Sequence, residues 1–314
     1  MTQCLYQNQR LDGKLCDRLY AATGCDPRSP MVERRTQEAA AIFQSGQASL
    51  FALVGELVDF SLSYGYPVSF RGEVGSLLVS HLLGFAQNDP MDLGIPWQGA
   101  FSPDGLAPNI TLNFAPEVVW AARHHLKEIA EGCNVLWDVP GLPPQRVVFA
   151  PERYDPDHEY LTLDIFSYRL LGQVGDAAKR AARLPRREEV LSPDFIRWAW
   201  ALDNMWEVPV LREIAPLRDY APEIEPVTFA HLTRLLGLAL LPSDRWAPLN
   251  EPDVTLDMVA GTREDVYENR LRDGVPPGDA LDALQKEREL YPRGQCAEYL
   301  TYGLLLAWFW DNEE

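Results

Sequence analysis

Apolar residues recur at helical spacing over residues 32–65, and a glycine at position 65 ends the run. Residues 66–70 then predict a short strand, residues 71–73 a turn, and residues 74–83 an apolar helix. Residues 1–30 show only weak periodicity, so we expect a loosely structured leader there. The opening of the chain therefore predicts a helical segment followed by a strand, a glycine turn and a helix N-terminus.

Further along the chain, short strands give way to helices alone. Three more strands are predicted, at residues 109–114, 146–149 and 160–165, and the first and last of them alternate polar and apolar residues like half-buried strands. Helices separated by prolines follow, at residues 194–206, 228–241, 254–259, 263–272, 278–290 and 295–310. The sequence thus predicts an α+β protein. We expect a leader at residues 1–30, a domain with a small sheet at residues 31–170 and a helical domain at residues 171–314.

Two of the predicted strands gather polar residues on one face. In the first strand, Asn109, Thr111 and Asn113 share a face because side chains alternate in direction. In the last strand, Thr162 and Asp164 lie together on the face opposite to that of the apolar residues. Asp164 is a candidate metal ligand, although a lone strand aspartate is more often simply solvated.

Charge sets a strong limit on function. The 314 residues carry 28 cationic and 46 acidic side chains, a net charge of -18, and residues 201–314 hold 10 of those cations and 22 of those acids. This balance favours solubility and opposes binding to polyanions, so we expect weak or absent affinity for nucleic acid. A single basic cluster, which is either a solvated helix face or a phosphate contact, comprises Lys179, Arg180, Arg183, Arg186 and Arg187.

The sequence also predicts the cellular compartment of the protein. The longest apolar run, near residues 299–310, is too short to span a bilayer, and the polar N-terminus lacks a signal-peptide core. Five cysteines form no C-x-x-C pair, so we expect reduced thiols and no zinc site. These features predict a cytoplasmic protein with no membrane partner.

The glycine turn is a candidate phosphate site. Gly72 and Gly75 would let backbone N–H groups approach an anion at a helix start, Arg71 would add positive charge, and Ser76 completes the candidate set. Glu73 argues against a bound anion, and a tight strand-to-helix turn needs glycines in any case. We therefore favour a packing role for this turn, with phosphate binding as the alternative.

Several segments in this order carry a family resemblance. They are R-G-E-V-G-S at 71–76, P-N-I-T-L-N-F at 108–114, L-T-L-D-I at 161–165, T-F-A-H-L-T-R-L-L-G-L at 228–238 and Y-P-R-G-Q-C-A-E-Y at 291–299. The chain resembles the palm and fingers of the PolC-type alpha subunit of DNA polymerase III. The resemblance implies a small mixed β-sheet palm of the polymerase-beta-like nucleotidyltransferase type and a large, mostly helical fingers-like region.

The departures from that family concern its metal site. The resemblance implies three aspartates that hold two magnesium ions, a chemistry that needs anionic oxygen ligands. Asn109 and Thr111 stand where two of the carboxylates are expected, and only Asp164 remains. We expect these three residues on neighbouring strands of one sheet, facing one cleft. We expect no cofactor, because one carboxylate should hold Mg²⁺ weakly.

Residues that would handle a triphosphate also differ. Where the resemblance implies a lysine in the segment at 161–165, this chain has Thr162. Where it implies a histidine in the segment at 291–299, this chain has Gln295. Arg71 and Arg293 remain as isolated cations that could contact phosphate.

Two functions follow from this comparison of motifs. The favoured one is a catalytically degenerate pseudo-polymerase that binds an unidentified protein partner, within DNA replication or mobile-element biology. The alternative is an active DNA polymerase or nucleotidyltransferase fragment, in which acids such as Asp155 or Asp157 rebuild a magnesium site around Asp164.

Overall fold

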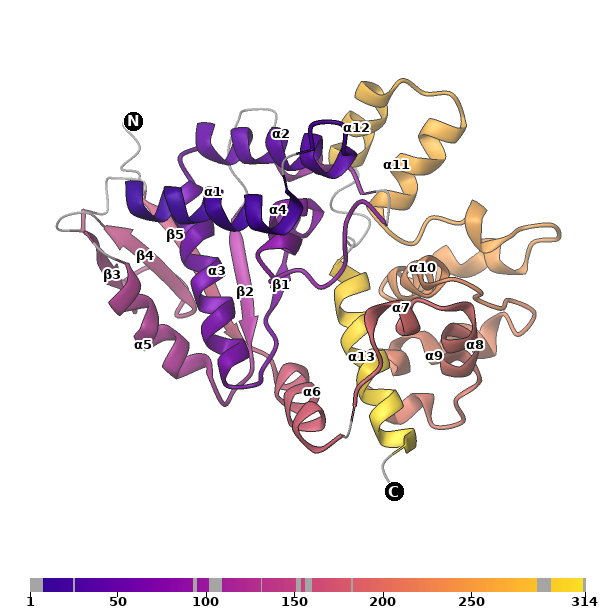
Figure 1. Ribbon diagram of the computed structural model, residues 1–314. Coiled ribbons are helices and arrows are strands. Elements are labelled where there is room, and N and C mark those ends of the chain that lie inside the picture. The colour runs from indigo at the N-terminus through magenta and orange to yellow at the C-terminus, as the bar shows by residue number, and fades with distance from the viewer. Residues whose placement is uncertain are drawn as a thin grey trace. The chain divides into compact units, whose positions relative to one another are not determined.

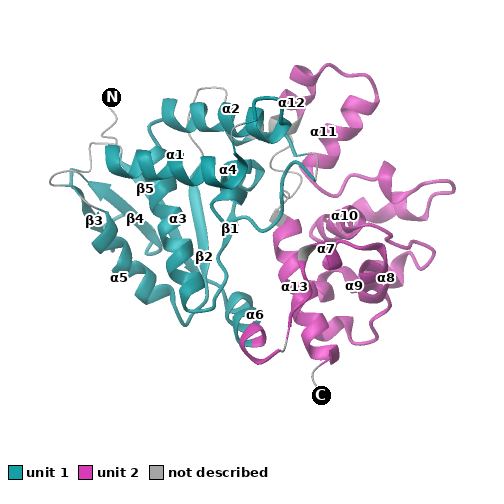
Figure 2. Ribbon diagram, viewed as in Figure 1, with its two compact units in different colours: residues 1–176 teal, residues 177–314 magenta. Residues whose placement is uncertain are grey.

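The chain divides into two compact units, residues 1–176 and residues 177–314 (Figure 2). The computed structural model describes residues 8–24, 26–92, 95–101, 109–130, 132–150, 154–155, 160–181, 183–286 and 295–312. The first unit contains the sheet and the second is helical. The α+β class predicted from the sequence is confirmed.

A five-stranded mixed sheet forms the centre of the first unit (Figure 1). Its strands are β1 Ser69–Arg71, β2 Ile110–Phe114, β3 Asn134–Leu136, β4 Arg146–Ala150 and β5 Leu161–Ser167. They lie in the order β1-β2-β5-β4-β3, and β2 and β5 are parallel while the other pairs are antiparallel. The sequence predicted four of these strands and missed the short edge strand β3. The sheet is small and mixed, as expected, whereas its identity as a nucleotidyltransferase palm remains a prediction.

One face of the sheet forms the core of the first unit. The apolar residues on this face are almost completely buried: Phe70, Ile110, Leu112, Phe114, Val147, Phe149, Leu163 and Ile165. Helix α3 passes in front of the sheet in Figure 1, and α5 contacts both β3 and β5. Strict alternation therefore leaves the polar residues of the strands on the opposite face.

The helices of the first unit include one that the sequence did not predict. They are α1 Gln9–Thr23, α2 Pro30–Gln44, α3 Ala48–Ser63, α4 Leu78–Leu82, α5 Val119–Ile129 and α6 Arg169–Arg180, the last of which contains the boundary between the units. The expectation of a loosely structured leader is wrong for α1. Asn8 caps this helix with its side chain, and Leu11, Leu15 and Leu19 are buried along one stripe that packs against α3.

The second unit is built from helices, as the sequence predicted. They are α7 Arg187–Val190, α8 Pro193–Ala201, α9 Leu211–Tyr220, α10 Phe229–Ala239, α11 Arg263–Arg272, α12 Pro277–Lys286 and α13 Gln295–Asn312. Helix α9, which contains Pro216, lies in the region expected to be helical but was not given bounds of its own. The helix predicted at 254–259 is wrong, since only the short 3-10 helix η5 Leu256–Met258 forms there.

Within the described residues, no single helix has the length and apolar character needed to cross a membrane. The pair α2 and α3 meets that test only together, and it is bent by 115°.

Candidate functional site

A row of side chains crosses four strands on the polar face of the sheet. Asp164 of β5 lies directly opposite Thr111 of β2 on one side and Arg146 of β4 on the other. Thr111 in turn pairs with Arg71 of β1. Residues that pair across strands point to the same side of a sheet. The row therefore runs Arg71, Thr111, Asp164, Arg146, and the prediction that Thr111 and Asp164 lie on neighbouring strands is confirmed.

Arg146 binds both oxygens of the Asp164 carboxylate. Its Nε donates to Oδ1 and its Nη2 donates to Oδ2, each at 2.8 Å, which is the two-point geometry of a strong charge-assisted pair. Asp164 is only 9% exposed. Its hydrogen bonds and negative charge raise the pKa of Arg146, against the opposing effect of burial. The acidic member of the row is thus neutralised by its neighbour in the sheet.

Asn113 of β2 organises the polar groups beside this pair. Its Nδ2 donates to Oγ of Ser69 at 3.1 Å, and its Oδ1 accepts from Nε of Arg71 at 2.9 Å. The Arg71 guanidinium lies 4.7 Å from the ring centroid of Phe166, a cation–π arrangement. Asn113 is fully buried. Contacts within the sheet therefore fix the position of Arg71.

The other predicted site residues are more scattered. Asn109 immediately precedes β2 and is exposed. The backbone N–H of Asp155 donates to the hydroxyl of Tyr160 at 2.9 Å. Asp157 and Arg293 lie outside the described residues. The structure thus brings together Arg71, Thr111 and Asp164, while the proposed rebuilding of a metal site by Asp155 or Asp157 remains a hypothesis.

The donors of the polar face do not fit the two magnesium ions that the resemblance implies. Mg²⁺ needs hard, preferably anionic oxygen ligands, and the row has one carboxylate whose oxygens both accept from Arg146. Asn109 and Thr111 would add only neutral oxygens. Nowhere in the described part of the chain do three His, Cys, Asp or Glu side chains form a group that could hold a metal ion. A cation beside Asp164 would also meet the charge of Arg146.

Backbone geometry and packing account for both glycines of the turn. Gly72 has a φ of +91°, a conformation that favours glycine. The 3-10 helix η1 Glu73–Ser76 follows, and a Cβ on Gly75 would lie 1.9 Å from ring carbons of Phe70. The single helix predicted at 74–83 is therefore wrong, because η1 and the short α4 replace it. These contacts support a packing role for the turn.

A carboxylate of the protein occupies the helix start after this turn. Oε2 of Glu38 accepts from the backbone N–H of Val79 in α4 at 2.9 Å, and Oε1 accepts from Nε of Arg34 at 2.8 Å. Arg34 also donates to the carbonyl oxygen of Ser76 at 2.7 Å. Glu38 is fully buried, and this burial raises its pKa. An internal anion therefore takes the position where a phosphate could bind a helix N-terminus.

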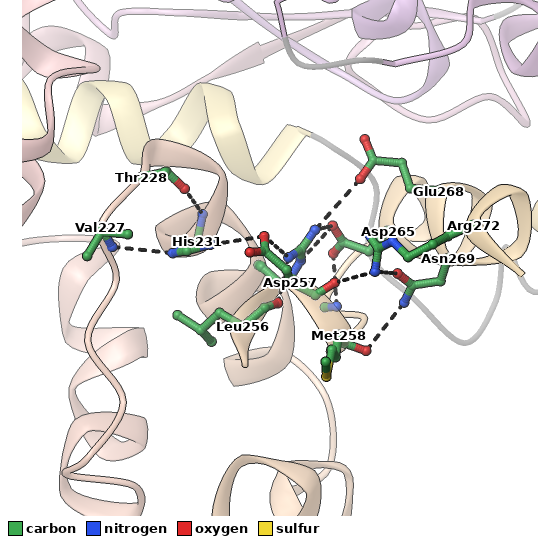
Figure 3. Close-up of polar contacts among 12 residues, drawn as sticks. Val227, Thr228, His231, Leu256, Asp257, Met258, Asp265, Glu268, Asn269 and Arg272 are labelled. Carbon is green, nitrogen blue, oxygen red and sulfur yellow. Dashed lines mark hydrogen bonds and ion pairs between the residues drawn. The ribbon is translucent and has the colours of Figure 1, made fainter. Parts of the chain in front are cut away.

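In the second unit, polar contacts tie α10 to the segment around α11 (Figure 3). Nε of Arg234 donates to Oδ1 of Asp265 at 2.9 Å, and both residues are buried. Nε2 of His231 lies 3.1 Å from Oδ1 of Asp257, and this hydrogen bond lowers the pKa of Asp257. Segment 228–238, which is one of those that resemble the polymerase family, is thus held in place by these hydrogen bonds and ion pairs.

Two important residues were missed in the sequence. Arg146 begins a strand that was predicted correctly at residues 146–149, but a single strand's pattern does not reveal which residue lies opposite it. Glu38 follows Arg34 by four residues, a spacing that predicts an ion pair on a helix. Nothing local indicates that this pair reaches the N-terminus of α4.

Comparison with known proteins connects the first unit to a polymerase family. Residues 9–127 match the family model described as the bacterial DNA polymerase III alpha NTPase domain. The PolC-type DNA polymerase III enzymes of Thermotoga petrophila and Thermotoga maritima are each 43% identical to this chain over 67 residues. The enzyme of Caldanaerobacter subterraneus is 40% identical over the same length. In each case the match covers 21% of this chain and 5% of the relative, so the chain spans only a small part of these enzymes.

Proposed function

Because residues 9–127 relate this chain to the PolC-type DNA polymerase III alpha family at the level of one domain, we propose that the protein is a polymerase-derived binding protein without nucleotidyl transfer activity. In this account the sheet of the first unit corresponds to a palm, and the helical second unit corresponds to fingers. The resemblance of the later segments, 228–238 and 291–299, supports the second assignment.

The ion pair between Arg146 and Asp164 carries the proposal. Two-metal nucleotidyl transfer requires carboxylates that bridge cations next to the reacting oxygens. Here the remaining carboxylate accepts two hydrogen bonds from a guanidinium, and neutral Thr111 lies across from it. Arg146 supplies, from within the sheet, the positive charge that a metal ion would bring. Asp164 is therefore a structural residue in this account.

The proposed role is binding to a protein, in DNA replication or in the biology of mobile elements. The net charge of -18 disfavours a nucleic-acid partner. A chain that keeps part of a replicative polymerase's fold would also keep surfaces that contact other proteins. The partner itself is an open target for affinity capture with the full chain.

Manganese titration tests whether the polar face holds a metal. Isothermal calorimetry with Mn²⁺ on the wild-type chain and on Asp164→Ala should give the same weak binding, because the other acidic residues account for it. The triple variant Asn109→Asp, Thr111→Asp, Arg146→Leu should bind at least about tenfold more tightly, since it supplies three carboxylates without the competing cation. A wild-type site that Asp164→Ala abolishes would favour the alternative, an active nucleotidyltransferase.

A further inference from the structure

A pocket with a volume of about 730 Å³ lies between α5 and the edge strand β3. Trp120, His124 and Lys127 line it from one side of α5, because positions three and four apart share a helix face. Trp137 and Asp138, directly after β3, line the other side. The volume lies within the range typical of sites for small molecules.

The guanidinium of one arginine in this pocket lies close to two indoles. The guanidinium carbon of Arg123 is 5.1 Å from the ring centroid of Trp120 and 4.9 Å from that of Trp137, close enough for cation–π attraction to both rings. Trp120 is 73% exposed. A large apolar ring left this open to water offers a stacking surface for a planar group.

The polar lining favours an anion. Arg123 and Lys127 are cationic and His124 adds a further nitrogen, against a single acid, Asp138. Nη2 of Arg123 donates to the carbonyl oxygen of Ile165 at 3.3 Å, but its Nε is buried with no hydrogen-bond partner in the described structure. Burial also lowers the pKa of Arg123, with Asp138 opposing the shift. A negative group nearby would offset the cost of keeping this partly desolvated cation.

We propose that this pocket binds a small organic anion with a planar ring, of the chemical class of a nucleoside monophosphate. The ring stacks on Trp120, and the anionic group lies near Arg123 and Lys127. A short ligand fits the charge of the molecule better than a nucleic-acid strand, since a chain with a net charge of -18 repels a polyanion. The site lies on α5 and β3 and does not depend on the function proposed for the polar face.

Isothermal calorimetry with AMP, adenosine and inorganic phosphate separates the contributions of ring and anion. AMP should bind the wild-type chain more tightly than either of the other two compounds. Trp120→Ala should weaken AMP binding by about tenfold or more, the scale of a lost stacking contact. Lys127→Gln should weaken AMP and phosphate while leaving adenosine unchanged. Both substitutions are at helix surface positions, so neither depends on refolding of the core.

Trp206→Ala is the matched control, because Trp206 is 51% exposed and belongs to the second unit. It should leave AMP binding unchanged. Equal effects of Trp120→Ala and Trp206→Ala, or no binding of AMP to the wild-type chain, would overturn the proposal. A single-stranded oligonucleotide that binds far more tightly than AMP and loses affinity steeply with salt would also overturn it, in favour of a nucleic-acid surface.

Discussion

Asp164 shows how a cross-strand partner determines what a carboxylate can do. On an exposed strand this side chain would be solvated and free to bind a cation. Opposite Arg146 it is largely buried and accepts two charge-assisted hydrogen bonds. The same residue therefore contributes to the stability of the sheet, because removal of either partner leaves the other charge poorly compensated.

Replacement of Asp164 by alanine should lower the free energy of unfolding by about 3 kcal/mol, because Arg146 then loses its partner inside the sheet. Asp59→Ala is the control, since Asp59 pairs with Arg18 on the surface with its side chain 59% exposed, and it should cost less than about 1 kcal/mol. Urea denaturation of both variants measures the difference. Similar losses in the two variants would mean that the pair of Asp164 and Arg146 stabilises the protein no more than a surface ion pair does.

Glu38 gives a prediction for pH dependence. Burial raises its pKa above the ordinary value of 4.5, so the folded protein holds this proton more tightly than the unfolded chain does. The contribution of Glu38 to stability should therefore fall as the pH rises from about 4.5 through the folded pKa. Glu38→Gln removes the titration. Urea denaturation at successive pH values gives the free energy of unfolding of both proteins. The value for the wild type minus the value for the variant should decline over this pH range. A constant or rising difference would contradict the raised pKa of Glu38.

At the scale of single residues, the sequence predicted which side chains share a face but not which ones touch. Period-two alternation correctly grouped Thr111 with Asn113, because that pattern depends only on backbone geometry. The contact between Asp164 and Arg146 depends on register between strands that are separate in the chain, which no local pattern encodes. The family resemblance indicated where a carboxylate remained, and the structure supplied its partner.

At the scale of elements, the glycine turn makes a direct prediction about packing. Gly75→Ala should destabilise the protein by roughly 2 kcal/mol or more, because the new Cβ would overlap the ring of Phe70. Gly72→Ala should cost about 1 kcal/mol through its φ of +91°. Gly13→Ala in α1 is the matched control. It has ordinary φ and open space around it, so it should be neutral or stabilising.

Thermal denaturation of the three glycine variants measures these effects, and a titration with inorganic phosphate accompanies it. Normal melting of Gly75→Ala together with a lost phosphate affinity would replace the packing role with the phosphate role.

Some elements could be predicted from their own residues, and others could not. Helix α11 was predicted with its observed bounds, and in the structure Thr262 and Asp265 form a capping box at its start. Helix α1 was missed, since most of its surface is polar and its stability comes from three buried leucines against α3. Strand β3 is only three residues long and forms through pairing with β4. Tertiary contacts decide such elements, so their own residues give little signal.

At the scale of the whole molecule, charge governs which partners can approach. The net charge of -18 should keep duplex DNA away at physiological salt. The basic cluster near α7 offers little compensation, because Arg183 and Arg186 both pair with Glu189. Fluorescence anisotropy with a labelled duplex should therefore show no saturation at micromolar protein in about 0.15 M salt. Tight binding that weakens steeply as salt is raised would show that a local basic surface overcomes the global charge.

The central claim, that this polymerase-related chain lacks nucleotidyl transfer because Arg146 neutralises Asp164, is tested most directly by primer extension. The wild-type protein is incubated with a primed template and all four deoxynucleotide triphosphates, with Mg²⁺ and with Mn²⁺ in separate reactions. The account predicts no extension by the wild type in either metal, and none by Asp164→Ala. Extension by the wild type that Asp164→Ala abolishes would contradict it and would make Asp164 a catalytic residue.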